Sequence, residues 1–187
     1  MKISRVYIYL KLKNLFFSFF SNSYLSKKKL SKNLLEMTNK KYVEFFGMCR
    51  TSFIVILEFL KEKKPNKNEI IVCSYNLKEM IDIIKNYKFK TSLIDIQKHN
   101  GLIDIKELKN RISQNTAAIL YTNMFNDYSH AERIKEMCIE NDILLIEDCA
   151  IYYGNYTTKD NKKTYAGSIG DVSIFSFGIM KNVCAIF

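Results

Sequence analysis

Compact apolar runs alternate along most of this chain with segments whose apolar residues recur at helical spacing. The runs are predicted to be strands, because they are short and several are apolar throughout, as in strands buried on both faces of a sheet. We expect strands at about residues 42–47, 69–73, 91–94, 116–121, 143–147 and 172–177. Strands that alternate with helices form βαβ units, so the pattern predicts an α/β fold with a mostly parallel sheet.

Two of the predicted helices carry a starting signal. Asp104 is followed three residues later by Glu107, and Ser129 is followed in the same way by Glu132. This spacing is typical of a capping box, in which side chains bind the free amides of the first helical turn. In α/β folds of this kind, ligands bind at the carboxyl ends of the strands, so candidate site residues are sought there.

Charge and cysteine content argue against several classes of protein. The net charge of +10 would suit a polyanionic partner, but it comes mainly from lysines spread along the chain. Nucleic-acid binding usually clusters basic residues on one element, so no nucleic-acid partner is expected. The five cysteines contain no Cys-x-x-Cys pair. We therefore expect neither a disulfide framework nor a metal site, and a cytoplasmic location.

The first part of the chain differs from the rest. Residues 1–41 are basic and aromatic, and we assign them to an N-terminal arm, with residues 42–187 as the domain. Lys11 and Lys13 interrupt the apolar run of the arm, which leaves it shorter than the roughly 20 residues that span a bilayer. The arm is expected to pack on the domain or on a partner subunit; contact with a membrane surface is the alternative. Residues 31–41 are either a linker or a helix end.

The residues that could carry out chemistry lie from the end of the predicted strand at 143–147 onward. The acidic pair Glu147-Asp148 ends that strand, a loop of small residues spans 166–171, and Lys181 follows the last strand. Each feature is ordinary by itself, because an aspartate at a strand end often caps a helix and a lysine usually faces solvent. Their order along the chain is much less common.

This block resembles the DegT-type family of fold-type I aminotransferases, whose pattern runs IEDaAqahG and then GsxGDxxxFSFxxxKN. The matching residues are 146–150 and Gly154 in the first part, and Gly167-Ser168, Gly170-Asp171, Phe175-Ser176-Phe177 and Lys181-Asn182 in the second. Weaker similarity reaches back to about Tyr42. The resemblance implies the three-layer αβα large domain of a pyridoxal-phosphate (PLP) enzyme, incomplete at its C-terminus and without the small C-terminal domain.

The resemblance also implies roles for individual residues. Lys181 would hold PLP covalently and move a proton between substrate and cofactor. Asp148 would pair with the pyridine nitrogen of PLP. Ser176 would donate its hydroxyl to the cofactor phosphate. Thr51 and Ser52 open a predicted helix, where backbone amides suit a phosphate, and they are further candidates.

Several positions depart from the family pattern. Ile151 stands where the family commonly has Gln, and Tyr153 stands where it has His. Residues 122–126 replace the family's VHxYG segment. Tyr75 is the candidate to cover the cofactor ring, with core packing as the alternative. Arg50 is either part of the phosphate turn or structural.

The implied function is transfer of an amino group from an amino acid, with glutamate as the expected donor, to a keto-sugar nucleotide, by a homodimer when complete. The alternative is an inactive fragment or a binding protein that reuses the fold. In the family, an antiparallel strand follows the lysine and lies between the strands expected here at 42–47 and 172–177. That strand is missing from this sequence, so we expect marginal stability, weak PLP binding and no transamination.

Overall fold

The centre of the molecule is a five-stranded sheet with the strand order β2-β1-β3-β4-β7, in which every neighbouring pair is parallel. Its strands are β1 (Glu69–Cys73), β2 (Lys90–Ile94), β3 (Thr116–Thr122), β4 (Leu144–Asp148) and β7 (Val172–Ile174). The computed structural model describes residues 16, 19–20, 22–98, 100–123, 130–159, 161–178 and 181. The predicted parallel sheet is confirmed.

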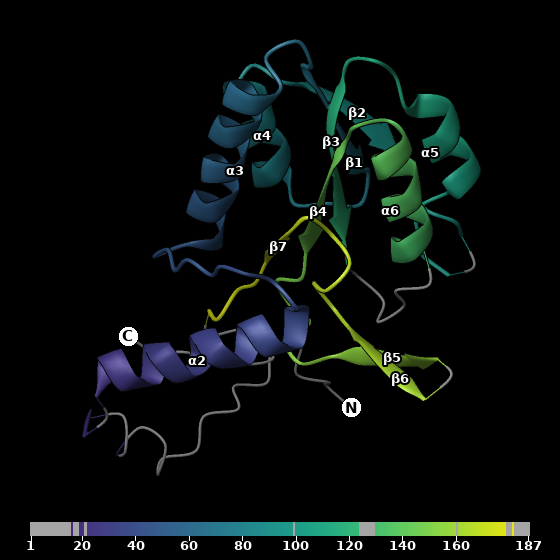
Figure 1. The fold of residues 1–187 in the computed structure, drawn as a ribbon. Helices are drawn as coiled ribbons and strands as arrows, with labels where there is room; N and C mark the ends of the chain where they lie inside the picture. Colours follow the sequence, from purple (N-terminus) through teal and green to yellow (C-terminus); the bar gives the residue numbers. More distant parts are fainter. Residues whose placement is uncertain are drawn as a thin grey trace, which may run out of the picture.

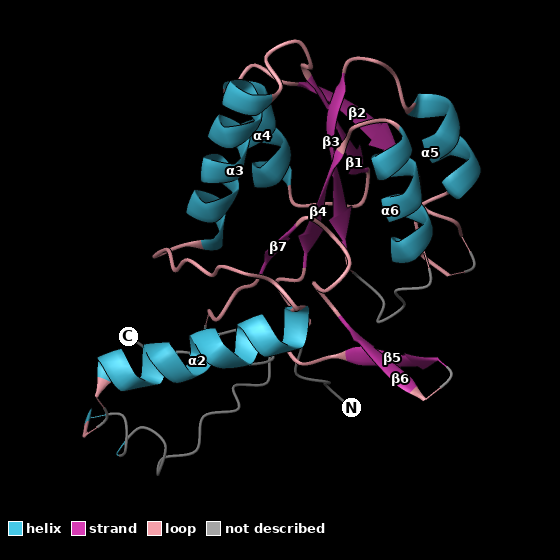
Figure 2. Cartoon of the chain, in the orientation of Figure 1, coloured by secondary structure: helices cyan, strands magenta, loops and turns pink. Residues whose placement is uncertain are grey.

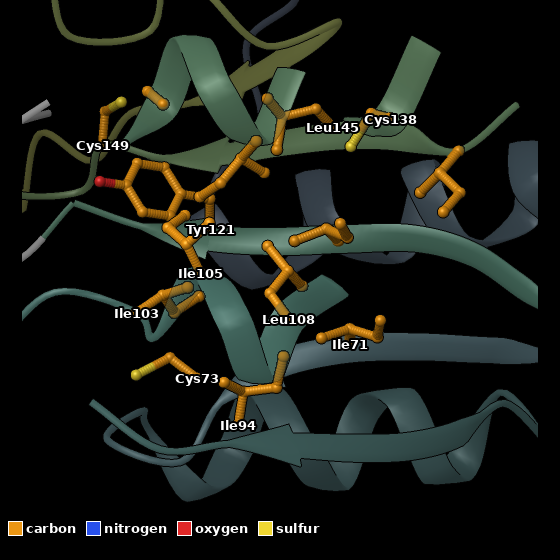
Figure 3. Packing of buried hydrophobic residues seen from close by; sticks show 14 of the residues in the cluster. Ile71, Cys73, Ile94, Ile103, Ile105, Leu108, Tyr121, Cys138, Leu145 and Cys149 are labelled. Atoms are coloured by element: carbon orange, nitrogen blue, oxygen red, sulfur yellow. The ribbon is translucent and has the colours of Figure 1, made fainter. Parts of the chain in front are cut away.

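Helices cover both faces of this sheet, which confirms the predicted three-layer architecture (Figure 1). The helices are α3 (Cys49–Lys63) and α4 (Lys78–Asn86) on one face, and α5 (Ile105–Arg111) and α6 (Ala131–Glu140) on the other. β1 is buried at every residue, because Ile71 faces the α5–α6 core while Ile70 and Val72 face the α3–α4 core. Figure 3 shows the α5–α6 core, with Ile71, Leu108 and Leu145 packed together.

Strand boundaries differ modestly from the predicted ones. β4 ends at Asp148 rather than at residue 147, and β7 stops at Ile174 instead of continuing to residue 177. The prediction of a strand at residues 42–47 is wrong, because this segment is irregular. It borders a groove of about 570 Å³ whose other wall includes β7. In the part of the chain that the structure describes, no strand lies between residues 42–47 and β7. Residues 42–47 therefore have no neighbouring strand to bind their backbone, and a strand requires such a partner.

One segment of the predicted arm forms helix α2 (Ser23–Thr38), which lies beside the end of the domain where β4 and β7 finish (Figure 1). The Asn22 side chain caps its start by accepting from the amide of Leu25 at 3.2 Å. Asn39, in the left-handed conformation, ends it. Residues 31–41 are therefore a helix end rather than a linker. No helix that the structure describes is long and apolar enough to cross a membrane.

The predicted helix start at Asp104 is confirmed, since its side chain accepts from the amides of Lys106 and Glu107 at 2.8 and 3.0 Å. The reciprocal half of the capping box differs, because the Glu107 carboxylate accepts from the amide of Asp95 at 3.2 Å. Ser129 lies outside the described residues, and α6 begins after His130.

A two-stranded antiparallel hairpin was not predicted. It consists of β5 (Tyr156–Lys159) and β6 (Lys162–Tyr165) and projects away from the sheet (Figure 2). The Tyr156 and Tyr165 rings lie opposite each other with centroids 5.4 Å apart. Threonine and tyrosine on both sides of a short polar turn were the sequence signal for it.

Candidate functional site

Asp148 occupies the carboxyl end of β4, at the edge of the sheet where α/β proteins bind ligands. Its side chain is only 6% exposed, and one of its oxygens accepts from the amide of Ala150 at 3.0 Å. Burial raises the pKa of Asp148, whereas the Ala150 amide and the charge of Lys181 act in the opposite direction. The structure therefore brings Asp148 and Lys181 close enough for their charges to interact.

Lys181 follows β7 at the same edge and is half-buried. Its amide donates to the carbonyl of Gly178 at 2.9 Å, which closes a tight turn. A Cβ on Gly178 would lie 3.9 Å from both Cγ of Lys181 and Oγ of Ser176. These two predicted site residues therefore flank the same turn.

The start of α3 is the third part of this cluster. Cys49, its first residue, has its thiol pKa raised to about 11 by burial and by Asp148, with Lys181 opposing. The N-cap residue, Met48, makes no capping hydrogen bond with its side chain. The amide of Thr51 donates to Met48, and the hydroxyl of Ser52 donates to the carbonyl of Cys49 at 2.6 Å. Sequence reasoning did not select Cys49, because an isolated cysteine carries little signal.

Tyr75 follows β1 at the carboxyl edge of the sheet. It is 58% exposed and lines a cavity of about 10 Å³ together with Cys73 and Thr122. Within the described part of the chain, Asp148 and Lys181 are not among the residues that line this cavity. Among the same residues, no three His, Cys, Asp or Glu side chains are grouped so that they could hold a metal ion.

Glu147, the other member of the acidic pair, faces the opposite side of the sheet from Asp148 because side chains alternate along a strand. It is fully buried, and its carboxylate accepts from the amides of Gly167 at 3.0 Å, Ile169 at 2.8 Å and Gly170. The two acidic residues therefore have different roles: Asp148 lies in the candidate site, while Glu147 anchors the loop of small residues.

Two glycines of that loop, Gly167 and Gly170, have no room for a side chain. A Cβ on Gly170 would lie 2.9 Å from Cγ of Glu147, and a Cβ on Gly167 would lie 2.6 Å from the Phe175 ring. Gly167 also has a φ of +85°, which disfavours other residues. The Lys40 ammonium donates to the carbonyl of Gly170, and burial lowers the pKa of Lys40. Sequence reasoning missed Lys40, since its contact is 130 residues distant in the chain.

Both the sequence and the fold of this chain match those of known proteins. The model of the DegT/DnrJ/EryC1/StrS aminotransferase family matches residues 15–187, so the match includes α2. GDP-perosamine synthase of Vibrio cholerae is 26% identical over 110 residues, which are 59% of this chain and 29% of that protein. The chain thus spans less than a third of that relative's length.

Solved structures give the same fold. Helicobacter pylori PseC, an aminotransferase involved in the biosynthesis of pseudoaminic acid, matches with a TM-score of 0.71 and 18% identity, over 82% of this chain and 40% of that one. Escherichia coli GDP-4-keto-6-deoxy-D-mannose-3-dehydratase with bound hydrated PLP matches with a TM-score of 0.63 and 24% identity, over 76% of this chain and 37% of that one. Because the family model spans most of its sequence, this chain belongs to the DegT/DnrJ/EryC1/StrS aminotransferase family.

Proposed function

We propose that this chain is the PLP-binding part of an aminotransferase that moves an amino group from an amino acid to a keto-sugar nucleotide. The observation that carries the proposal is the meeting of Asp148 and Lys181 at the carboxyl edge of the sheet, beside the start of α3. A buried acid at the end of one strand and a half-buried amine that follows the next strand, close enough for their charges to interact, are typical of a functional site rather than of a solvated surface.

The chemistry of these groups fits PLP. Asp148 is a buried carboxylate able to face a protonated ring nitrogen, and the uncapped amides at the start of α3 suit a phosphate. Ser176, beside the same turn as Lys181, would add a hydroxyl donor to that phosphate. The Escherichia coli dehydratase with the same fold has PLP bound, which supports this choice of cofactor.

When bound, PLP would supply an electron sink for the carbon that exchanges its amino group. The side chains supply the rest of the chemistry. A cation next to Asp148 would offset the cost of burying its charge, so Asp148 would hold the ring nitrogen protonated. Lys181, in its neutral form, would act as nucleophile and then carry a proton at Nζ to and from the substrate carbon.

Thr51 and Ser52 would place the start of α3 at the phosphate; the Ser52 hydroxyl already donates to Cys49, and the Thr51 amide already donates to Met48. Glutamate is the expected amino donor. The sugar-nucleotide acceptor is suggested by GDP-perosamine synthase, whose name contains a nucleotide-linked amino sugar. We expect the complete enzyme to be a homodimer.

The test is covalent trapping. The chain is incubated with PLP, reduced with borohydride and digested, and the labelled peptides are mapped. We expect label on Lys181 at PLP concentrations that leave the other lysines unlabelled, and loss of that label in Lys181→Arg. Lys61→Arg, an exposed lysine on α3, is the matched control and should leave Lys181 labelling unchanged. Equal labelling of many lysines, insensitive to Lys181→Arg, would contradict the proposal.

The reaction type needs a separate assay, because one protein of the same fold is named as a 3-dehydratase. A keto-sugar nucleotide and glutamate are supplied to a preparation that contains the whole protein, and the sugar product is analysed by mass spectrometry. Gain of an amino group would support transfer, and loss of water without nitrogen would support dehydration instead.

A further inference from the structure

Residues 175–177, which follow β7, contact the rest of the described structure through the side chains of Phe175 and Phe177. The carbonyl of Ile174 accepts from the amide of Cys149 at 2.8 Å, and the next backbone bond runs from Lys181 to Gly178 at 2.9 Å. Between these two points, no backbone hydrogen bond ties residues 175–177 to any other residue that the structure describes. Something else must fix the path of the segment that carries Ser176 and leads to Lys181.

Tyr153 supplies contacts to that segment from the turn after β4. Its ring centroid is 5.2 Å from that of Phe177 at an interplanar angle of 70°, and 6.2 Å from that of Phe175 at 84°. Both are edge-to-face arrangements, the preferred geometry for aromatic pairs. One half-buried ring therefore contacts the residues on both sides of Ser176.

The position of Phe175 is restricted from a second direction. Its ring lies so close to Gly167 that a Cβ there would be 2.6 Å from Cζ of Phe175. Gly167 is itself held by the Glu147 carboxylate at 3.0 Å. Phe175 is thus confined between the glycine backbone and Tyr153.

Phe175 and Phe177 flank Ser176 in the chain, and the Tyr153 ring contacts both of their rings. Because Tyr153 contacts both phenylalanine rings, it restricts where they lie, and hence the path of Ser176 between them.

We propose that Tyr153 is a positioning residue that holds the Ser176–Lys181 segment against the end of β4, so that Lys181 faces Asp148. The importance of Tyr153 for catalysis rests on the proposed function. Its effect on the position of the Ser176 segment does not. In this scheme Tyr153 acts through its contacts with Phe175 and Phe177.

The experiment compares Tyr153→Phe, which keeps the ring, with Tyr153→Ala, which removes it. Two quantities are measured in each: PLP labelling of Lys181 relative to exposed lysines after borohydride reduction, and hydrogen–deuterium exchange of the peptide that covers residues 172–181. Thermal unfolding checks that both variants are folded at the assay temperature. Tyr156→Ala, in the hairpin ring pair, is the matched control.

We expect Tyr153→Ala to lower Lys181 labelling by about tenfold and to speed exchange of the Lys181 amide, which donates to Gly178, by a similar factor, because two aromatic contacts are lost. Labelling of exposed lysines should not change, and Tyr156→Ala should stay within about twofold of wild type. Tyr153→Phe, which keeps the ring, should be less impaired than Tyr153→Ala. Wild-type labelling and exchange in folded Tyr153→Ala would overturn the proposal, as would a Tyr153→Phe variant as impaired as Tyr153→Ala.

The two proposals fail in different ways. If wild-type Lys181 is not labelled by PLP but exchange of the Lys181 amide depends on the Tyr153 ring, the proposed function fails and the positioning role stands. If Lys181 is labelled and neither quantity responds to Tyr153→Ala, the positioning role fails alone.

Discussion

Glu147 binds the loop before β7 through a single buried carboxylate, so Glu147→Gln tests whether its charge is needed. The substitution preserves the length and volume of the side chain. It replaces one carboxylate oxygen with an NH₂ group, which can donate but cannot accept. In the wild type, one oxygen accepts from Ile169 and Gly170 and the other accepts from Gly167. Whichever way the amide turns, at least one loop amide then faces a donor.

The magnitude follows from these bonds. A hydrogen bond to a charged group contributes about 1.5–3 kcal/mol, and an unsatisfied buried donor costs a similar amount. We therefore expect Glu147→Gln to lower the free energy of unfolding by about 3 kcal/mol. For a domain of this size, that corresponds to a fall in Tm of about 6–12 °C.

The assay is thermal unfolding followed by circular dichroism, with the midpoint compared at one pH and one protein concentration. Glu140→Gln is the matched control, because Glu140 is an exposed residue of α6, and its midpoint should stay close to that of the wild type. If the midpoint of Glu147→Gln coincides with that of Glu140→Gln, the carboxylate does not anchor the loop and the reasoning is refuted.

Three further predictions follow from the same region. In a denaturant titration, Gly170→Ala should destabilise the chain by about 1–3 kcal/mol through overpacking, since the added Cβ would lie 2.9 Å from Cγ of Glu147. Gly47→Ala is the control and should be neutral, because nothing lies within 4 Å of the new Cβ. Asp148→Asn should stabilise the folded chain at neutral pH, because burial raises the pKa of Asp148 above its ordinary value of 3.8 and its charged form therefore opposes folding. Wild-type stability should accordingly fall relative to Asp148→Asn as pH rises from about 3.8 through the raised folded pKa, and parallel pH profiles of the urea midpoint would count against this assignment. Alkylation of Cys49 by iodoacetamide, resolved by peptide mapping, should keep accelerating up to about pH 11, because burial and Asp148 raise its pKa to about 11; a plateau near pH 9, the ordinary value, would contradict that environment.

The strands of the sheet were predictable because burial on both faces leaves a local signature. β1 and β3 are nearly continuous apolar runs, and their predicted positions hold to within one residue. The failure at residues 42–47 has the opposite origin. An extended apolar segment becomes a strand only when another strand binds its backbone, and the segment instead borders a groove. The hairpin of β5 and β6 was missed although its threonines and tyrosines carry a strand signal.

The sequence by itself determined the fold class and the candidate site residues Asp148, Ser176 and Lys181, because periodicity and the order of a motif are local properties of the chain. Only the tertiary structure decided the different roles of Glu147 and Asp148, since both follow the same apolar run and only the packing of each face distinguishes them. It likewise decided that Tyr153 contacts the Ser176 segment. Such contacts join residues that are distant in the chain, and they exist only once the sheet has brought two strand ends to one edge.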